Sequence, residues 1–306
     1  MTNTPTTKRR KPLAALLMSL ILPGLGQLYN GAINKAVWLF LIITLLSVPA
    51  VLLATLYLPA DWMIPTLLGS IGLVLLVWLY SMVDAFRSAR RQPDYVLLGW
   101  QCSGVYVLVF LLWNTLALPL LLEYVSKYQV ESFKVPSASM EPTVMTGDML
   151  FADKRYNRPG TRQAVQRGDI AIFVYPNDRT TYFIKRIVGL PGDKIQIRSN
   201  EVLINGKSTR VLSENVAGGL RVTETDGKRN WQVFWASNKP TLLPSELTVP
   251  PGQVFVLGDN RNDSHDSRVF GTIPLQDVIG KARQVWLSLD NKAQQVRWER
   301  SGKVLQ

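Results

Sequence analysis

Three long apolar runs constrain the fold of this chain more than any other feature of its sequence. They lie at about 36–58, 62–83 and 98–122, and none of them contains a charged residue. Each run is close to the roughly 20 residues that a helix needs to cross a lipid bilayer. Buried helices of a soluble protein are rarely both this long and uncharged. We therefore expect three membrane-spanning helices.

The charged residues divide the chain into two parts. Residues 1–125 hold eight Lys and Arg and four Asp and Glu, whereas residues 126–306 hold 26 and 18. This contrast predicts a membrane region, 1–125, followed by a polar domain, 126–306, of an ordinary size for one domain. The only cysteine, Cys102, falls within the third apolar run, so the polar domain has no disulfide.

The polar domain is also basic, with 26 Lys and Arg against 18 Asp and Glu. Its basic residues are scattered, with no recognition helix and no patch of mixed aromatic and basic residues. We therefore expect no nucleic-acid partner. The excess of positive charge instead indicates attraction to the anionic headgroups of the lipid bilayer.

A shorter apolar segment at 12–30 decides between alternative topologies. Pro23, Gly24 and Gly26 interrupt it, so it is either a secretory signal or a short interfacial or re-entrant segment. Basic residues favour cytoplasmic loops, and three crossings place the basic clusters at 8–11 and 87–91 together on that side. We therefore expect an interfacial or re-entrant segment, three spans of the inner (cytoplasmic) membrane, and an extracytoplasmic (periplasmic) polar domain.

The polar domain shows the short alternating segments of a mostly β fold. The pattern also predicts a hairpin at 201–207, because Asn205-Gly206 is a strong turn signal. A more polar stretch at about 199–250 predicts an inserted subdomain. The other predicted strands are 148–153, 169–175, 181–189, 194–198, 230–236, 252–259 and 280–289.

The stretch PSASMEPTVMTGD, residues 136–148, places Ser139 in a turn-forming setting that suits an exposed nucleophile. One residue that could take its proton is Lys185. Alternation along the strand places Lys185 on one face with Phe183 and Ile187, where desolvation lowers the pKa of an amine. The strand alone favours the more ordinary interpretation, a lysine whose stem packs on the sheet while its ammonium group reaches water.

The other base to consider is His265, the only histidine. It lies in the polar, turn-rich segment GDNRNDSHDSR, with Asp263 or Asp266 as an orienting acid, or it is simply a loop residue. One histidine and one cysteine are too few for a zinc site. The sequence contains no Walker loop and no GxGxxG after a strand, so we expect no metal and no cofactor.

Four segments in order resemble the type I signal peptidases, the membrane-bound leader peptidases of the S26 family, which are serine proteases with a Ser–Lys dyad. The resemblance spans roughly residues 133–288, nearly all of the polar domain. The four segments are VPSASMEPTVMTGDML at 135–150, RGDIAIFVYP at 167–176, YFIKRIVGLPGDKI at 182–195 and LGDNRNDSHDSRVFGTIP at 257–274.

The resemblance implies a role for each matching residue. Ser139 corresponds to the nucleophile and Lys185 to the general base. Ser137 matches the position whose hydroxyl forms the oxyanion hole together with the Ser139 backbone N–H. Ser264 matches the serine that orients the lysine by a hydrogen bond. The remaining match is a supporting charged pair, Asp266 and Arg268, whereas His265 falls at a variable position.

The function implied by the resemblance is removal of N-terminal signal peptides from exported preproteins, after small residues at positions −1 and −3. Ser139 lies 17 residues beyond Leu122, so we expect the site at the outer membrane surface. Alternatives are a peptidase dedicated to one pilin or conjugation protein, or an inactive membrane-anchored binding protein. Members of the family usually have one or two membrane spans before the serine segment, whereas three are expected here. The additional membrane segments within residues 1–97 could contact a translocase.

Overall fold

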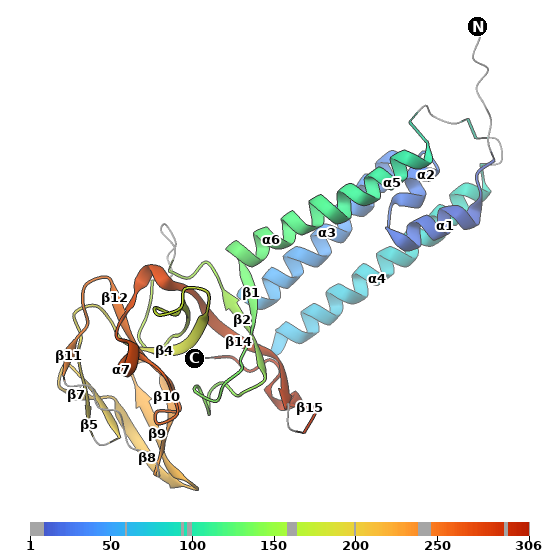
Figure 1. The fold of residues 1–306 in the computed structure, drawn as a ribbon. Coiled ribbons are helices and arrows are strands. Elements are labelled where there is room, and N and C mark those ends of the chain that lie inside the picture. Colours follow the sequence, from blue (N-terminus) through green and yellow to red (C-terminus); the bar gives the residue numbers. More distant parts are fainter. Residues whose placement is uncertain are drawn as a thin grey trace. The chain divides into compact units, whose positions relative to one another are not determined.

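The computed structural model describes residues 9–58, 60–92, 95–96, 100–157, 164–198, 200–237, 246–290 and 293–305. Its internal contacts divide the chain into a helical unit, Met1–Tyr124, and a β-rich unit, Val125–Gln306. Figure 1 shows helices from the blue to the green part of the chain and strands from green to red.

The helical unit contains three helices that are long and apolar enough to cross a membrane: Ile33–Leu56, Trp62–Arg90 and Ser103–Tyr128. The third is one continuous stretch of α5, a π-helical turn and α6. In full, the elements are α1 (Pro12–Ile21), α2 (Leu25–Tyr29), α3 (Ile33–Leu56), α4 (Ala60–Arg90), α5 (Ser103–Leu112), η1 (Trp113–Ala117) and α6 (Leu118–Tyr128).

These helices differ in their ends from the apolar runs of the sequence. Helix α4 continues through Asp84 to Arg90, because a helix does not stop where its hydrocarbon-facing part ends. Residues 97–99, at the start of the third run, lie outside the described residues. The placement of Cys102 within the third span is wrong, since Cys102 is the exposed N-cap residue just before α5.

The short helices α1 and α2 pack on α4 through buried polar side chains. Gln27 donates to the Ser81 carbonyl oxygen at 2.8 Å and accepts from the hydroxyls of Ser19 and Ser81. Asn30 donates to the Ala85 carbonyl oxygen at 2.8 Å. In hydrocarbon such groups need internal partners. These bonds therefore fix the glycine-rich segment PGLGQLYNG, residues 23–31, against α4.

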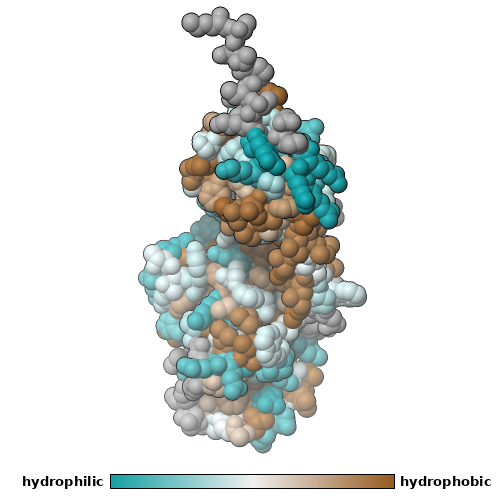
Figure 2. Space-filling model, turned by 90° about the vertical axis from the view of Figure 1, so that its right-hand side faces the viewer, coloured by the Kyte–Doolittle hydropathy of each residue, from teal (hydrophilic) through white to brown (hydrophobic). Residues whose placement is uncertain are grey.

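The outer surface of the helical unit is largely apolar. Leu45, Leu68 and Leu76 are each more than 60% exposed, which would be unusual on a water-soluble protein. Figure 2 shows brown, apolar areas on this face of the molecule, below hydrophilic side chains near the N-terminal end. The arrangement suits a unit surrounded by lipid.

The described part of the β-rich unit contains three antiparallel sheets. The largest has the strand order β1-β2-β14-β3-β4-β12-β13, with β15 paired to β14. Its strands are β1 (Val130–Lys134), β2 (Asp148–Asp153), β3 (Ile170–Val174), β4 (Tyr182–Gly189), β12 (Gln253–Leu257), β13 (Ile273–Pro274), β14 (Val278–Asp290) and β15 (Gln295–Val296). The prediction of a mostly β domain is confirmed.

Two smaller sheets have the orders β11-β5-β6-β7 and β10-β9-β8. Their strands are β5 (Lys194–Arg198), β6 (Glu201–Ile204), β7 (Lys207–Ser208), β8 (Arg210–Val216), β9 (Gly219–Thr225), β10 (Asn230–Ala236) and β11 (Leu247–Thr248). Short helical turns are α7 (Ser267–Phe270), η2 (Leu275–Asp277) and η3 (Trp298–Arg300). Most predicted strands lie within a residue or two of these bounds, but β1, β8, β9, β11, β13 and β15 have no counterpart among them.

The segment predicted as an insertion, 199–250, shares its core with the rest of the unit. Trp231 and Trp235 of β10 pack in one buried cluster with Val188 of β4 and Phe255 of β12. Residues 199 and 238–245 of this segment lie outside the described residues. The three-stranded sheet therefore supports β4 and β12, the two strands beside the candidate site.

Candidate active site

Ser139 lies in the serine loop, residues 135–147, which joins β1 to β2. Two side chains of this loop, Met140 and Val144, are fully buried in a cluster beneath it. The backbone around Ser139 is held from outside the loop by Asn260, whose N–H donates to the Ser139 carbonyl oxygen at 3.1 Å and whose side-chain amide donates to Ala138 at 3.2 Å. Packing and hydrogen bonds thus fix the position of Ser139, which is 8% exposed.

Lys185 reaches Ser139 from strand β4. Its Nζ lies 2.7 Å from Ser139 Oγ and also donates to the Ile184 carbonyl oxygen at 3.0 Å. Lys185 is 4% exposed, and its Nζ lies 5.4 Å from the centre of the Phe183 ring. The structure therefore brings together the two residues that the sequence proposed as nucleophile and base.

The surroundings of Lys185 favour its neutral form. Burial lowers the pKa of its amine from 10.5 to about 8, against the opposing attraction of Asp266 and Asp259. Within the described residues, no carboxylate forms an ion pair with this lysine. A neutral amine with a free electron pair is what proton abstraction from a serine hydroxyl requires.

Ser137 lies on the same side of the serine loop, with its Oγ 3.2 Å from Ser139 Oγ. A hydroxyl at this distance from a nucleophile can donate to negative charge that develops on the attacked carbonyl oxygen. The structure thus brings Ser137 to the place that an oxyanion-hole donor would occupy.

Ser264 differs from its expected role. Its Oγ is buried and has no hydrogen-bond partner in the described part of the chain, so the expected bond to Lys185 is absent. Ser264 is nevertheless close to the serine loop through Gly258. A Cβ at Gly258 would overlap both Ser264 Oγ and the Ser139 carbonyl oxygen. Gly258 is therefore required for this close approach, and no turn or motif signal in the sequence indicated it.

The expected charged pair is present and fully buried. Arg268 Nε lies 2.8 Å from Asp266 Oδ1, and the two side chains are 1% and 0% exposed. Asp266 Oδ2 also accepts a hydrogen bond from the Gly258 N–H at 3.0 Å. The pair therefore fixes the backbone that follows β12, at the point where it contacts the serine loop.

His265 belongs to a different cluster. Its Nε2 lies 3.0 Å from Tyr175 Oη, and its ring contacts those of Phe183 and Phe270. No hydrogen bond joins His265 to Ser139 in the described residues, and Asp266 is already paired with Arg268. The described residues therefore do not bring Ser139 and His265 together as the triad would require, and His265 is an exposed member of an aromatic cluster.

Arg186, the residue after Lys185, points to the other face of β4 and is also buried. Its guanidinium binds Asp259 through two bonds of 2.8 and 2.7 Å, and both side chains are 0% exposed. It also donates to the Gly168 carbonyl oxygen at 2.6 Å. Strand β12 pairs with β4, which brings Asp259 beside Arg186.

The C-terminal segment, residues 295–305, holds the serine loop from the other side. Arg300 forms a buried ion pair with Asp148, and it donates to the Thr143 carbonyl oxygen at 3.1 Å. Leu305 is buried in the same cluster as Met140 and Val144. These contacts link positions more than 150 residues apart, so no local sequence pattern could have revealed them.

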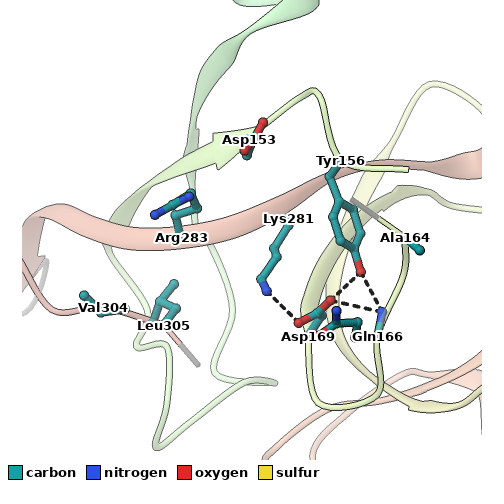
Figure 3. A pocket seen from close by; sticks show the side chains of 9 residues that line it. All are labelled: Asp153, Tyr156, Ala164, Gln166, Asp169, Lys281, Arg283, Val304 and Leu305. Carbon is teal, nitrogen blue, oxygen red and sulfur yellow. Dashed lines mark hydrogen bonds and ion pairs between the residues drawn. The ribbon is translucent and has the colours of Figure 1, made fainter. Parts of the chain in front are cut away.

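A separate cavity of about 350 Å³ lies beside β14 and contains neither residue of the dyad. Figure 3 shows that its main polar groups bind one another: Asp169 accepts hydrogen bonds from Lys281 and Tyr156. The described residues contain no group of three or more His, Cys, Asp or Glu side chains that could hold a metal ion. The cavity therefore offers no alternative to the Ser139–Lys185 site.

Comparisons with known proteins agree on one family. The family model described as signal peptidase, peptidase S26, matches residues 107–287 of this 306-residue chain. Signal peptidase I of Pseudomonas fluorescens is 32% identical over 234 residues, which cover 68% of this chain and 82% of that protein. Signal peptidase I of Rickettsia typhi is 35% identical over 192 residues, or 52% of this chain and 72% of that protein.

Among solved structures, a signal peptidase I from Enterococcus faecalis is 32% identical, with a TM-score of 0.27, and the match covers 40% of this chain and 98% of that one. The family match covers more than half of this chain and includes the serine loop, β4 and the segment after β12. The chain is therefore a member of the signal peptidase family, peptidase S26.

Proposed function

We propose that this chain removes N-terminal signal peptides from exported preproteins, with Ser139 as the nucleophile and Lys185 as the general base. Membership of the family makes the chain a serine endopeptidase, and its named relatives are signal peptidases I. The observation that supports the residue assignment most directly is the 2.7 Å contact between Lys185 Nζ and Ser139 Oγ.

The proposed reaction begins when Ser139 Oγ attacks the scissile carbonyl carbon and its proton passes to the neutral Lys185 amine. Ser137 Oγ and the Ser139 N–H donate to the developing oxyanion. The C–N bond then breaks, and the Lys185 ammonium returns its proton to the leaving amine. Water hydrolyses the acyl-enzyme with Lys185 again accepting a proton, which regenerates Ser139.

Asp266 and Arg268 are proposed as positioning residues. They hold the Gly258 N–H, and through the close contact at Gly258 they hold the backbone of the serine loop. Ser264 lies at this contact, and its unpartnered Oγ would be available to Lys185 if the lysine rotated during turnover. We assign it a supporting role on this proximity.

The proposed location is the inner membrane, with three spans formed by α3, α4 and the α5–α6 stretch. With three spans, basic residues at 9–11, 35 and 87–91 share the cytoplasmic side, as the positive-inside rule requires. The β-rich unit is then extracytoplasmic, where exported preproteins present small residues at −1 and −3.

The test is cleavage of a preprotein with an Ala-x-Ala site by the full chain in detergent. We expect Lys185→Ala to lose at least about 10⁴-fold in rate, because the serine then lacks its base. His265→Ala is the control and should cleave at the wild-type rate. An inactive histidine variant beside an active lysine variant would refute the dyad. Failure of the wild type on general preproteins would favour a dedicated substrate.

A further inference from the structure

The helical unit contains a cavity that the peptidase function does not use. It has a volume of about 310 Å³ and lies between the start of α3 and the last turns of α4. Its charged lining consists of Lys35, Asp84, Arg87 and Arg91. Three cations and one carboxylate therefore face the same small space.

The single carboxylate of this lining is already neutralised. Asp84 Oδ1 lies 2.8 Å from Lys35 Nζ, and Asp84 Oδ2 accepts a hydrogen bond from Gln27. Arg87 lies in the last turn of α4 and Arg91 directly follows the helix, and neither forms an ion pair with another described residue. Two arginines that line one cavity, whose carboxylate Asp84 is already bound to Lys35, suit the oxygens of a phosphate.

Lys35 is the third residue of α3, and Arg87 and Arg91 flank the end of α4, so the cavity is at the ends of two candidate spans. If these helices cross the bilayer, the cavity lies where hydrocarbon meets water, on whichever side of the membrane it faces. Tyr80 and Val83 also line the cavity, further from the end of α4, and are 58% and 44% exposed. The lining thus changes from basic to apolar over about three helical turns.

We propose that this cavity, the headgroup cavity, binds the phosphate of an anionic phospholipid. The two arginines would hold the phosphate, while Tyr80 and Val83 would contact the glycerol and upper acyl chain. A free phosphate ion would gain nothing from that apolar part, whereas a lipid uses both. This site would tie the membrane region to anionic lipid through specific contacts, in addition to the general attraction of basic residues.

The chain offers a matched control for this proposal in Arg90. It lies on the same end of α4, is exposed, and carries the same charge, but it does not line the cavity. The experiment is native mass spectrometry of the full chain in detergent, titrated with phosphatidylglycerol or with phosphatidylcholine of the same chain length. The variants are Arg87→Ala, Arg91→Ala and Arg90→Ala, each checked for wild-type preprotein cleavage.

We expect tighter binding of phosphatidylglycerol than of phosphatidylcholine, and a loss of about five- to tenfold with Arg87→Ala or Arg91→Ala. Arg90→Ala should change binding by less than about twofold. An equal loss in all three variants would mean diffuse attraction and overturn the proposal. Equal binding of the two lipids, or displacement of phosphatidylglycerol by inorganic phosphate at equal concentration, would overturn it as well.

Discussion

The two faces of strand β4 each bury a basic side chain, but only one of these side chains has an acidic partner. On one face Lys185 is 4% exposed and touches a serine hydroxyl, a carbonyl oxygen and an aromatic ring. On the other face Arg186 is 0% exposed, and Asp259 binds its guanidinium through two bonds. An arginine stays charged and needs an acid, whereas a lysine in such a place has a lowered pKa, gives up its proton more readily and can act as a base.

Removal of Asp259, the acid that binds Arg186, should have the largest effect on stability. Asp259→Ala leaves Arg186 buried and charged, so we expect a loss of about 3–5 kcal/mol in the free energy of unfolding. The measurement is urea denaturation of the full chain in detergent, followed by tryptophan fluorescence. Asp277→Ala is the matched control, because it leaves Arg179, whose side chain is 60% exposed and reaches water, so the loss should be no more than about 1 kcal/mol. Equal losses in the two variants would break the comparison.

In the candidate active site, removal of a hydroxyl should lower the cleavage rate and leave the free energy of unfolding almost unchanged. Ser137→Ala removes a proposed oxyanion donor, so kcat should fall by about 10²- to 10³-fold. The free energy of unfolding should change by no more than about 0.5 kcal/mol, because no buried charge loses its partner. Steady-state cleavage with saturating preprotein measures the first quantity. An unchanged kcat would remove Ser137 from the mechanism.

Replacement of the reactive lysine should stabilise the protein at neutral pH. The Lys185 pKa is lowered to about 8 in the folded state, so below that pH folding must bury a charge. The shift from 10.5 corresponds to about 3 kcal/mol, which Lys185→Met should recover at pH 7. Since the unfolded chain binds more protons between about 8 and 10.5, wild-type stability rises with pH there and the advantage of the variant shrinks. Denaturation midpoints at several pH values test this, and a constant advantage would contradict it.

The same pKa sets the pH dependence of cleavage. Only the neutral amine accepts the Ser139 proton, so kcat/KM should rise about tenfold per pH unit below about 8 and level off above it. Initial rates with one preprotein across this range give the profile. A midpoint near 6.5, the ordinary pKa of an imidazole, would point to His265 instead.

The sequence indicated the reacting groups and the supporting pair Asp266 and Arg268, but not the rest of their support. Ser139 and Lys185 were identifiable because each lies in a segment that resembles the signal peptidase family, whereas the strand around Lys185 alone left its role open. Asp259, Gly258 and Asn260 lie within the matching segment 257–274, but they act on residues 73 to 122 positions away, so only the fold reveals their roles. Strand β8 was missed for a different reason: it is exposed along almost its whole length, so its sequence lacks alternation between apolar and polar positions.

The helical unit illustrates the same limit. Hydropathy located the apolar cores of the three long helices but ended the second run at 83, where the charged turns of α4 begin. The bonds that fix α2 on α4 join Gln27 and Asn30 to residues 54 and 55 positions later, and a single sequence carries no signal for such pairs.

The anchoring of the serine loop by the C-terminal segment also sets an order of assembly during synthesis. Ser139 and Lys185 leave the ribosome more than 100 residues before Arg300 and Leu305, which complete the support beneath the loop. A nascent chain that carries both reacting groups therefore lacks these contacts beneath the nucleophile loop until Arg300 and Leu305 have been made. Support of the loop is thus completed only after helices α3 to α6 have left the ribosome.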